Sequence, residues 1–379
     1  MSGPPALRAL LITELEEIGE IEDEWRALAV SRGNAFVTPE WVRAWWSVQD
    51  QESASLRIIA VRSPDGLLGV LPLALDTSRR PHALRFAGAG LGDRFHPVAA
   101  PEDEAVVAAA AVDPGCGDLT RRMVLFEHIE PGREWVQAMR GAAPRRLAVN
   151  WQASTQLPYI SLKGLDWETY VAQRSKKFRS ELRRRERMRE EQLDARLATK
   201  ESLESDLDEL FRLHALRWGG QRVSVLTQPR TQAVLRAFAA AAMRQDWLRL
   251  HVLEADGSAV AAMLAWRVGN SYAFYNSGFD PAWSSKSIGT VLTSVAIKQA
   301  IEEQADEFDF LLGGEAYKRR FTPDSRPAAN AVLTPAFRPI SLLVKTENRV
   351  RALGRMVAGK PILRGVSRRT RRALPTERS

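Results

Sequence analysis

The sequence has a single cysteine, Cys116, in 379 residues, so no disulfide can form within the chain. Its five histidines are scattered without the spacing of metal ligands, and we expect no metal site. It contains no run of eighteen apolar residues, and its first residues lack a basic segment followed by a long apolar one. These absences indicate neither a membrane span nor a secretory signal, and they favour a cytoplasmic protein.

The positive charge is confined to one end of the chain. Formal net charge is +8, but the residues from Asn348 onward hold ten Lys or Arg against one acidic residue, while residues 1–347 hold 44 basic and 45 acidic side chains. A near-neutral body argues against a nucleic-acid-binding fold. The basic tail has apolar residues at helical spacing, namely Val350, Leu353, Met356 and Val357. It fits either an arm on an anionic membrane or a disordered tail.

Length and a 45% apolar content favour two packed domains. Alternation and turn signals predict strands at 7–12, 122–126, 248–254, 259–268, 271–279, 308–312 and 329–333, with a hairpin within 56–76. Helical periodicity predicts helices at 18–29, 102–112, 131–141, 174–191, 202–217 and 231–244. Thr38 before Pro39 predicts a capped helix start. Residues 84–101 are Gly-rich and are predicted to form a strand that ends in a loop. Asp93 and His96 of this loop are candidates to line a cleft.

Residues 271–321 concentrate the chemistry, in the order strand, loop, helix, strand, charged loop. Small residues between Ser285 and Thr290 stand where the helix begins, so unpaired backbone N–H groups at its positive end can face a phosphate. The alternative is a Ser-capped helix start that only happens to have a glycine nearby.

Four stretches carry a resemblance to a known family: FVTPEWVRAWW, RSKKFRSELRRRERM, GFDPAWSSKSIGTVL and FDFLLGGEAYKRRF. Together they resemble the double-domain branch of the GNAT acyltransferase superfamily, which includes acetyltransferases associated with cellulose biosynthesis and is related to Fem-type aminoacyl transferases. The resemblance implies an α/β (α+β) fold of two GNAT-like domains, each a mixed, largely antiparallel sheet flanked by helices. We expect domains at 1–155 and 156–340, the second with the acyl-CoA site, and a basic tail at 341–379.

The resemblance also implies a site. The backbone near Tyr275 would line the pantetheine arm of acetyl-CoA or another acyl-CoA, and the start of the following helix would hold its pyrophosphate. The donor-binding candidates are Asn276, Ser277, Gly278, Lys286, Ser287, Ile288, Gly289 and Thr290. Lys286 replaces the Arg or Gln of the best-known phosphate loop, and Val291 replaces its second small residue. Acceptor-binding candidates are Lys176, Lys177, Arg179, Arg183 and Lys318.

For the chemistry, Asp309 and Glu315 are the candidate bases, and Tyr275 and Tyr317 are the candidate acids for the leaving thiolate. Asp309 alternatively serves as a buried structural acceptor. The predicted activity is transfer of an acyl group to an amine or hydroxyl of a small molecule or saccharide, as in polysaccharide biosynthesis. Acetyl is the favoured acyl group. The alternatives are a tRNA-dependent Fem-like transferase, which the near-neutral body disfavours, and a non-catalytic binding protein on the same scaffold. The expected location is cytoplasmic, with the tail as a means of peripheral membrane contact.

Overall fold

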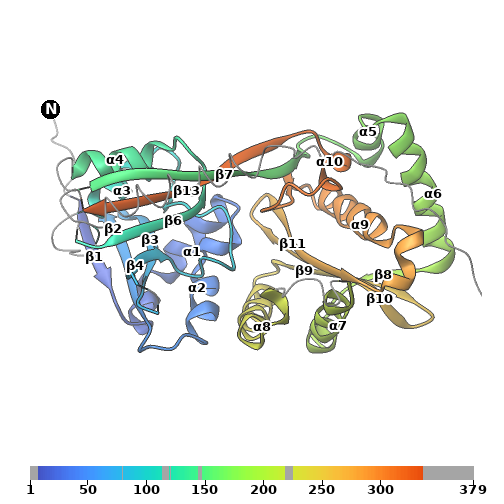
Figure 1. The fold of residues 1–379 in the computed structure, drawn as a ribbon, viewed down its shortest axis with the longest axis horizontal. Coiled ribbons are helices and arrows are strands. Elements are labelled where there is room, and N and C mark those ends of the chain that lie inside the picture. The colour runs from blue at the N-terminus through green and yellow to red at the C-terminus, as the bar shows by residue number, and fades with distance from the viewer. Residues whose placement is uncertain are drawn as a thin grey trace, which may run out of the picture. The chain divides into compact units, whose positions relative to one another are not determined.

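The structure, a computed structural model, describes residues 7–78, 80–112, 119, 121–143, 147–217 and 225–335. Cys116 and the basic tail lie outside these residues, so the predictions made for the tail stay predictions. Residues up to Phe337 form one unit, in which two lobes are built on a shared sheet (Figure 1).

The first lobe is a five-stranded part of this sheet with two helices on each side (Figure 1). Its strands, in spatial order, are β1 (Arg8–Ile12), β2 (Ala54–Ser63), β3 (Gly66–Asp76), β4 (Ala83–Phe86) and β6 (Met123–Ile129), with β5 (Val98–Ala99) beside β3. Its helices are α1 (Glu22–Ser31), α2 (Pro39–Trp46), α3 (Glu104–Ala110) and α4 (Glu134–Ala142). Strands β4 and β6 are parallel, and the other pairs in this lobe are antiparallel.

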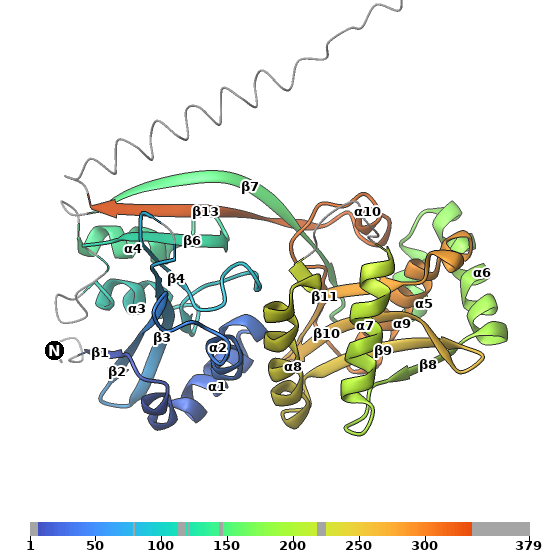
Figure 2. The ribbon, with the colours of Figure 1, turned by 60° about the horizontal axis from the view of Figure 1, so that its bottom comes forward.

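The second lobe repeats this plan. Its strands are β8 (Asp194–Leu197), β9 (Leu248–Ala255), β10 (Ser258–Val268), β11 (Ser271–Phe279) and β12 (Glu307–Asp309), and only β11 and β12 are parallel. Its helices are α5 (Trp167–Ala172), α6 (Lys176–Gln192), α7 (Leu203–Arg217), α8 (Pro229–Arg244), α9 (Ile288–Glu302) and α10 (Lys318–Phe321). Helices α7 and α8 cover one face of the sheet, and α6 and α9 cover the other (Figure 2).

Two long strands join the lobes by crossing between them. Strand β7 (Leu147–Ser161) follows the first lobe in sequence and pairs with β12 of the second, whereas β13 (Ser325–Pro335) follows the second lobe and pairs with β6 of the first. β7 and β13 also pair with each other, so the strand order at the centre is β6-β13-β7-β12. The boundary expected at residue 155 falls inside β7.

One apolar core runs from the first lobe into the second. Trp41 of α2 meets Phe238 of α8 edge to face, with ring centroids 5.1 Å apart, and Phe238 meets Trp266 of β10 at 4.7 Å. All three side chains are fully buried. Thr38 caps α2 by accepting a hydrogen bond from the Trp41 amide, as predicted. Helices α2 and α8 are therefore packed as in a protein interior.

The expected fold class, a mixed sheet flanked by helices, is confirmed. The prediction of a strand over 308–312 was wrong at its end, because β12 stops at Asp309 and Leu311 has a left-handed backbone with φ of 54°. Sequence periodicity also missed α5 and β8, which are six and four residues long and too short to show a repeat.

Acid should weaken this fold through His251 of β9. The side chain is 2% exposed and contacts the hydroxyl of Tyr272 through Nε2. Burial, assisted by nearby Arg249, lowers the pKa of His251 to about 3. The unfolded chain binds a proton there below about pH 6.5, so this residue removes stability as the pH falls from 6.5 toward 3, by roughly 2 kcal/mol at pH 5. Urea unfolding at pH 5 and pH 8 should therefore show a smaller difference in His251→Gln than in the unaltered protein. Equal differences would contradict the assignment.

Candidate functional site

The second lobe has a cleft where its two parallel strands separate. Strands β11 and β12 pair only from Ser271 to Ala273, opposite residues 307–309. Beyond these pairs they leave a space of about 530 Å³. Its lining includes Asp93, His214, Arg217, Tyr275, Asn276, Ser277, Leu312, Glu315, Tyr317 and Lys318. Seven candidates from the sequence thus meet in one cleft, namely Asp93, Tyr275, Asn276, Ser277, Glu315, Tyr317 and Lys318.

Gly278, expected to line the donor's arm, instead lets α7 pack against β11. A Cβ added at Gly278 would lie 2.1 Å from the backbone nitrogen of His214, so only glycine allows this approach. The close packing brings the end of α7 into the cleft. Gly278 is not among the residues that line it.

Helix α7 contributes two side chains that the sequence did not indicate as functional. His214 donates through Nδ1–H to the Ser277 carbonyl at 3.1 Å, and burial lowers its pKa, so the imidazole is neutral at pH 7. Arg217 donates to the Ser277 hydroxyl at 3.2 Å and lies 4.7 Å above the Phe279 ring. Both side chains line the cleft.

The charged loop after β12 is organised around Lys318, a candidate acceptor-binding residue that the structure buries. Its Nζ donates to the carbonyls of Phe310 and Leu312, both at 3.1 Å, and pairs with Glu315 at 2.8 Å. Burial and the Glu315 charge raise the pKa of Tyr317 in the same loop. Its phenol therefore stays protonated at neutral pH.

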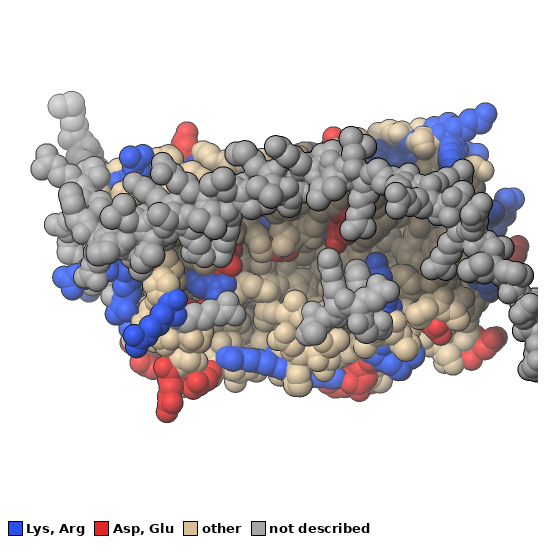
Figure 3. Space-filling view, in the orientation of Figure 1, with Lys and Arg blue, Asp and Glu red and all other residues tan. Residues whose placement is uncertain are grey.

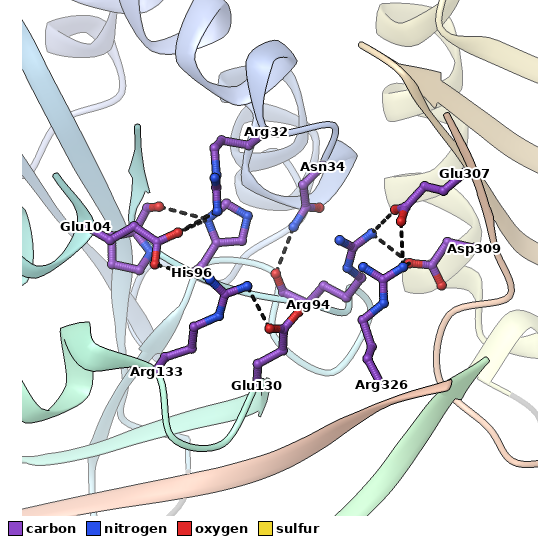
Figure 4. Close-up of polar contacts among 11 residues, drawn as sticks. Arg32, Asn34, Arg94, His96, Glu104, Glu130, Arg133, Glu307, Asp309 and Arg326 are labelled. Carbon is purple, nitrogen blue, oxygen red and sulfur yellow. Dashed lines mark hydrogen bonds and ion pairs between the residues drawn. The ribbon is translucent and has the colours of Figure 1, made fainter. Parts of the chain in front are cut away.

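Asp309 lies outside the cleft lining, in a charge network between the lobes (Figure 4). The carboxylate is fully buried, and it accepts hydrogen bonds from Arg94 at 2.6 Å and from the Leu311 amide at 2.7 Å. Arg94 also donates to Glu307 at 2.9 Å. Burial acts to raise the pKa of Glu307, but Arg94 and Arg326 outweigh it and lower this pKa. These contacts favour the structural alternative for Asp309.

Tyr275, the second candidate proton donor besides Tyr317, contacts the first lobe. Its hydroxyl donates to the Leu91 carbonyl at 2.9 Å. The phenol is thereby committed to the lobe interface, and Tyr317 is the better placed proton donor.

The start of α9 has the features expected of a phosphate cradle. Ser287 is left-handed, with φ of 52°, and its side chain does not cap the helix. Within the described part of the chain, the amides of Ile288 and Gly289 have no hydrogen-bond acceptor, whereas Thr290 donates to the Ser287 carbonyl. Arg185 of α6, which the sequence did not indicate, donates to the Ser287 hydroxyl at 2.9 Å.

Lys286 points its ammonium away from the helix start, since Nζ donates to Gln192 of α6 at 2.9 Å and lies 4.0 Å above the Trp283 ring. The helix start adjoins the cleft through Phe279, whose ring would lie 3.5 Å from a Cβ on Gly289. Because Arg217 of the cleft stacks on the same ring, the cleft and the helix start are neighbours.

Helix α6 carries the remaining acceptor candidates on its solvent side. Lys176, Lys177 and Arg183 are exposed. Arg179 instead donates to the carbonyls of Ala172 and Arg174 at the end of α5, a structural task. Figure 3 shows basic side chains along the margin of the second lobe where α6 lies.

The described residues contain neither a metal-binding cluster nor a membrane-spanning helix. No three His, Cys, Asp or Glu side chains come together in these ranges as they would around a metal ion. None of the described helices is long and apolar enough to cross a membrane.

Comparison with known proteins matches residues 176–319 to the family model for the acetyltransferase (GNAT) domain. No curated protein matches the chain. Among solved structures, FemX is similar with a TM-score of 0.63 and 11% identity, over 89% of this chain and 99% of that one. L-PGS from Bacillus licheniformis gives 0.52 and 14%, over 88% and 96%.

A further similar structure is the C-terminal domain of a protein from Agrobacterium fabrum named as a lysylphosphatidylglycerol synthetase. It gives a TM-score of 0.56 and 14% identity, over 93% of this chain and 100% of that domain. At these identities the likeness concerns the fold. The particular resemblance to cellulose-associated acetyltransferases finds no counterpart in these comparisons.

Removing Arg94 alone from the buried charge network should destabilise the fold. Arg94→Ala leaves Asp309 fully buried, with Arg326 3.7 Å from its Oδ2 as the remaining cation. Loss of one partner from a buried pair costs about 3 kcal/mol or more. Arg43→Ala is the control, because its pair with Glu22 is partly exposed and is worth about 1 kcal/mol or less. Urea unfolding of both variants tests this, and equal losses would refute it.

Proposed function

We propose that this protein transfers an acyl group from a coenzyme A thioester to an amine or hydroxyl, with the chemistry in the cleft between β11 and β12. One observation carries the proposal: the segment that matches the acetyltransferase model, residues 176–319, contains both strands of the cleft and the start of α9. The match supports acyl transfer in general. Coenzyme A as donor, and acetyl as the first acyl group to test, are the finer parts of the proposal.

The start of α9 suits the donor's pyrophosphate. Two backbone amides without acceptors in the described residues and the positive end of the helix dipole favour an anion. Gly289 has no side chain to keep a phosphate away, and Arg185 adds a guanidinium beside Ser287. We assign the pyrophosphate to these groups and the pantetheine arm to residues 275–277 of β11.

The cleft holds groups for both proton transfers that the reaction needs. A thioester supplies an electrophilic carbonyl carbon and a thiolate leaving group. As the acceptor's nitrogen or oxygen bonds to that carbon, the C–S bond breaks, and the acceptor's proton passes to Glu315 or to the neutral imidazole of His214. The protonated phenol of Tyr317 then donates to the thiolate sulfur.

The proposed acceptor is a small molecule or a saccharide. The candidates to contact it from the solvent side are Lys176, Lys177 and Arg183, which are exposed on α6. An acceptor that carries phosphate or carboxylate groups would suit these three cations.

A second candidate function is transfer from aminoacyl-tRNA. The acidic side chains of α6 tend to be paired, as in Glu181 with Arg320 and Glu186 with Lys298, so the exposed basic side chains dominate its outer face. The body is near-neutral overall, but this face is not, and a phosphodiester backbone would fit it.

The donor site is tested by Gly289→Val. A side chain at this position meets only Phe279 at ordinary contact distance, so the fold should persist, while the branched side chain blocks the approach of a phosphate. We expect calorimetry to show acetyl-CoA affinity reduced at least about tenfold. Ser294→Val, one turn further along α9, is the matched control and should bind normally. Unchanged affinity in folded Gly289→Val would refute the cradle. If neither acetyl-CoA nor longer acyl-CoAs shift the melting temperature of the unaltered protein, it is not a coenzyme A user.

The tRNA alternative predicts a salt-sensitive mobility shift with aminoacyl-tRNA. The shift should weaken in a variant with Lys176, Lys177 and Arg183 changed to Gln. Each phosphate contact that is lost lowers both the affinity and its dependence on salt. Absence of any shift at low salt would exclude this function.

A further inference from the structure

The loop that follows β4 crosses from the first lobe to the separated strands of the second. Three of its residues, within 91–94, contact the second lobe. The Leu91 carbonyl accepts from Tyr275 of β11, Asp93 Oδ2 accepts from the Leu312 amide at 3.2 Å, and Arg94 pairs with Asp309 of β12. The first lobe thus contacts β11, β12 and the segment that leaves β12.

That segment needs support from outside itself. Leu311 has φ of 54° and Gly313 has φ of 121°, and a left-handed leucine is unfavourable unless its surroundings hold it. From within, Lys318 ties the carbonyls of Phe310 and Leu312 together. The Asp309 carboxylate, at the end of β12, accepts locally from the Leu311 amide. From outside the segment, Asp93 accepts from the next amide, that of Leu312.

Asp93 is itself held in place by the first lobe. Its Oδ1 lies 3.0 Å from Nδ1 of His128 on β6, and its side chain is only 14% exposed. Burial opposes a charge on His128, but the nearby Asp93 carboxylate outweighs it and raises the pKa of this imidazole. The His128 amide donates to Asn330 of β13. A chain of contacts therefore runs from the long strand β13 through His128 and Asp93 to the Leu312 amide.

We propose that Asp93 is a positioning residue of the first lobe, which holds Leu312 and thereby the loop 310–318 that carries Glu315 and Tyr317. The inference rests on the proposed function, since it assigns those two side chains to the chemistry. Its structural part concerns the loop and is independent of that function.

The test compares Asp93→Ala with Asp93→Asn in the full chain. Alanine removes the acceptor for the Leu312 amide, whereas the asparagine Oδ1 keeps an acceptor and loses only the charge toward His128. Asp76→Asn is the matched control, because Asp76, like Asp93, is a partly buried carboxylate of the first lobe. Asp76 pairs with Arg85 and does not line the cleft.

We expect hydrogen exchange to accelerate in the peptide covering 310–318 of Asp93→Ala, with partial protection in Asp93→Asn and none of this effect in Asp76→Asn. Displacement of the catalytic groups should lower kcat about tenfold to a hundredfold in Asp93→Ala, and less in Asp93→Asn. Acyl-CoA affinity should change by less than about twofold, because α9 is not touched.

Two results would overturn the inference. One is unchanged exchange over 310–318 in Asp93→Ala, and a raised acceptor KM beside it would make Asp93 a substrate contact. The other is exchange that accelerates equally throughout the chain, which would make Asp93 a general stabiliser. If no acyl-CoA supports turnover by the unaltered protein, the proposed function fails, and the exchange data still decide whether Asp93 holds the loop.

Discussion

The pairing of β7 with β13 is the constraint on which the arrangement of the site depends. Each of these strands belongs by sequence to one lobe and pairs with the other, and they also pair with each other from Leu147 with Pro335 to Pro158 with Ser325. Because a strand register fixes which residues face each other, this ladder leaves little freedom for one lobe to slide past the other. The cleft of the second lobe can therefore include Asp93, a residue of the first.

The charges buried between the lobes fit a role in orientation better than one in stability. Arg94, Glu307, Asp309 and Arg326 exchange several ion pairs in a partly buried setting. Removing such groups from water costs nearly what their attraction returns, so well-packed apolar residues would serve equally well for stability alone. A charge network is more demanding in geometry than an apolar contact, since each hydrogen bond has a direction. Asp93 directly precedes Arg94 in this loop, so the network that fixes Arg94 against β12 also places Asp93 beside Leu312.

The elements that sequence could reveal are those with local signals. The aromatic run of β11, the periodicity of α9 and the Thr38 cap all lie within a few residues of the structure they determine, and all are confirmed. The cleft-lining role of His214 had no such signal, because it depends on Gly278, more than sixty residues away, which lets α7 approach β11. Lys318 was predicted to contact an acceptor because it lies in the charged loop that ends residues 271–321. Its three partners within its own loop explain why it is buried instead.

The likeness between the two lobes does not extend to a second donor site. Helix α3 lies in sequence between the parallel neighbours β4 and β6, as α9 lies between β11 and β12. At the start of α3, however, stands Glu104, which is 4% exposed and paired with Arg32 at 2.5 Å. A carboxylate in the first turn interacts favourably with the positive end of the helix and would repel a phosphate.

Beyond β4, Phe86 meets Phe95 and Phe126 with ring centroids 5.1 Å apart in each case, and Trp135 packs on Phe126 at 5.0 Å. The space that remains beside Arg85 and Phe86 is about 150 Å³, against about 530 Å³ in the cleft of the second lobe. The first lobe thus shares the strand pairing of the second, with aromatic side chains packed beyond its parallel strands. In the proposed function, its contribution is the loop it extends to the second lobe, where Leu91, Asp93 and Arg94 contact the strands that open.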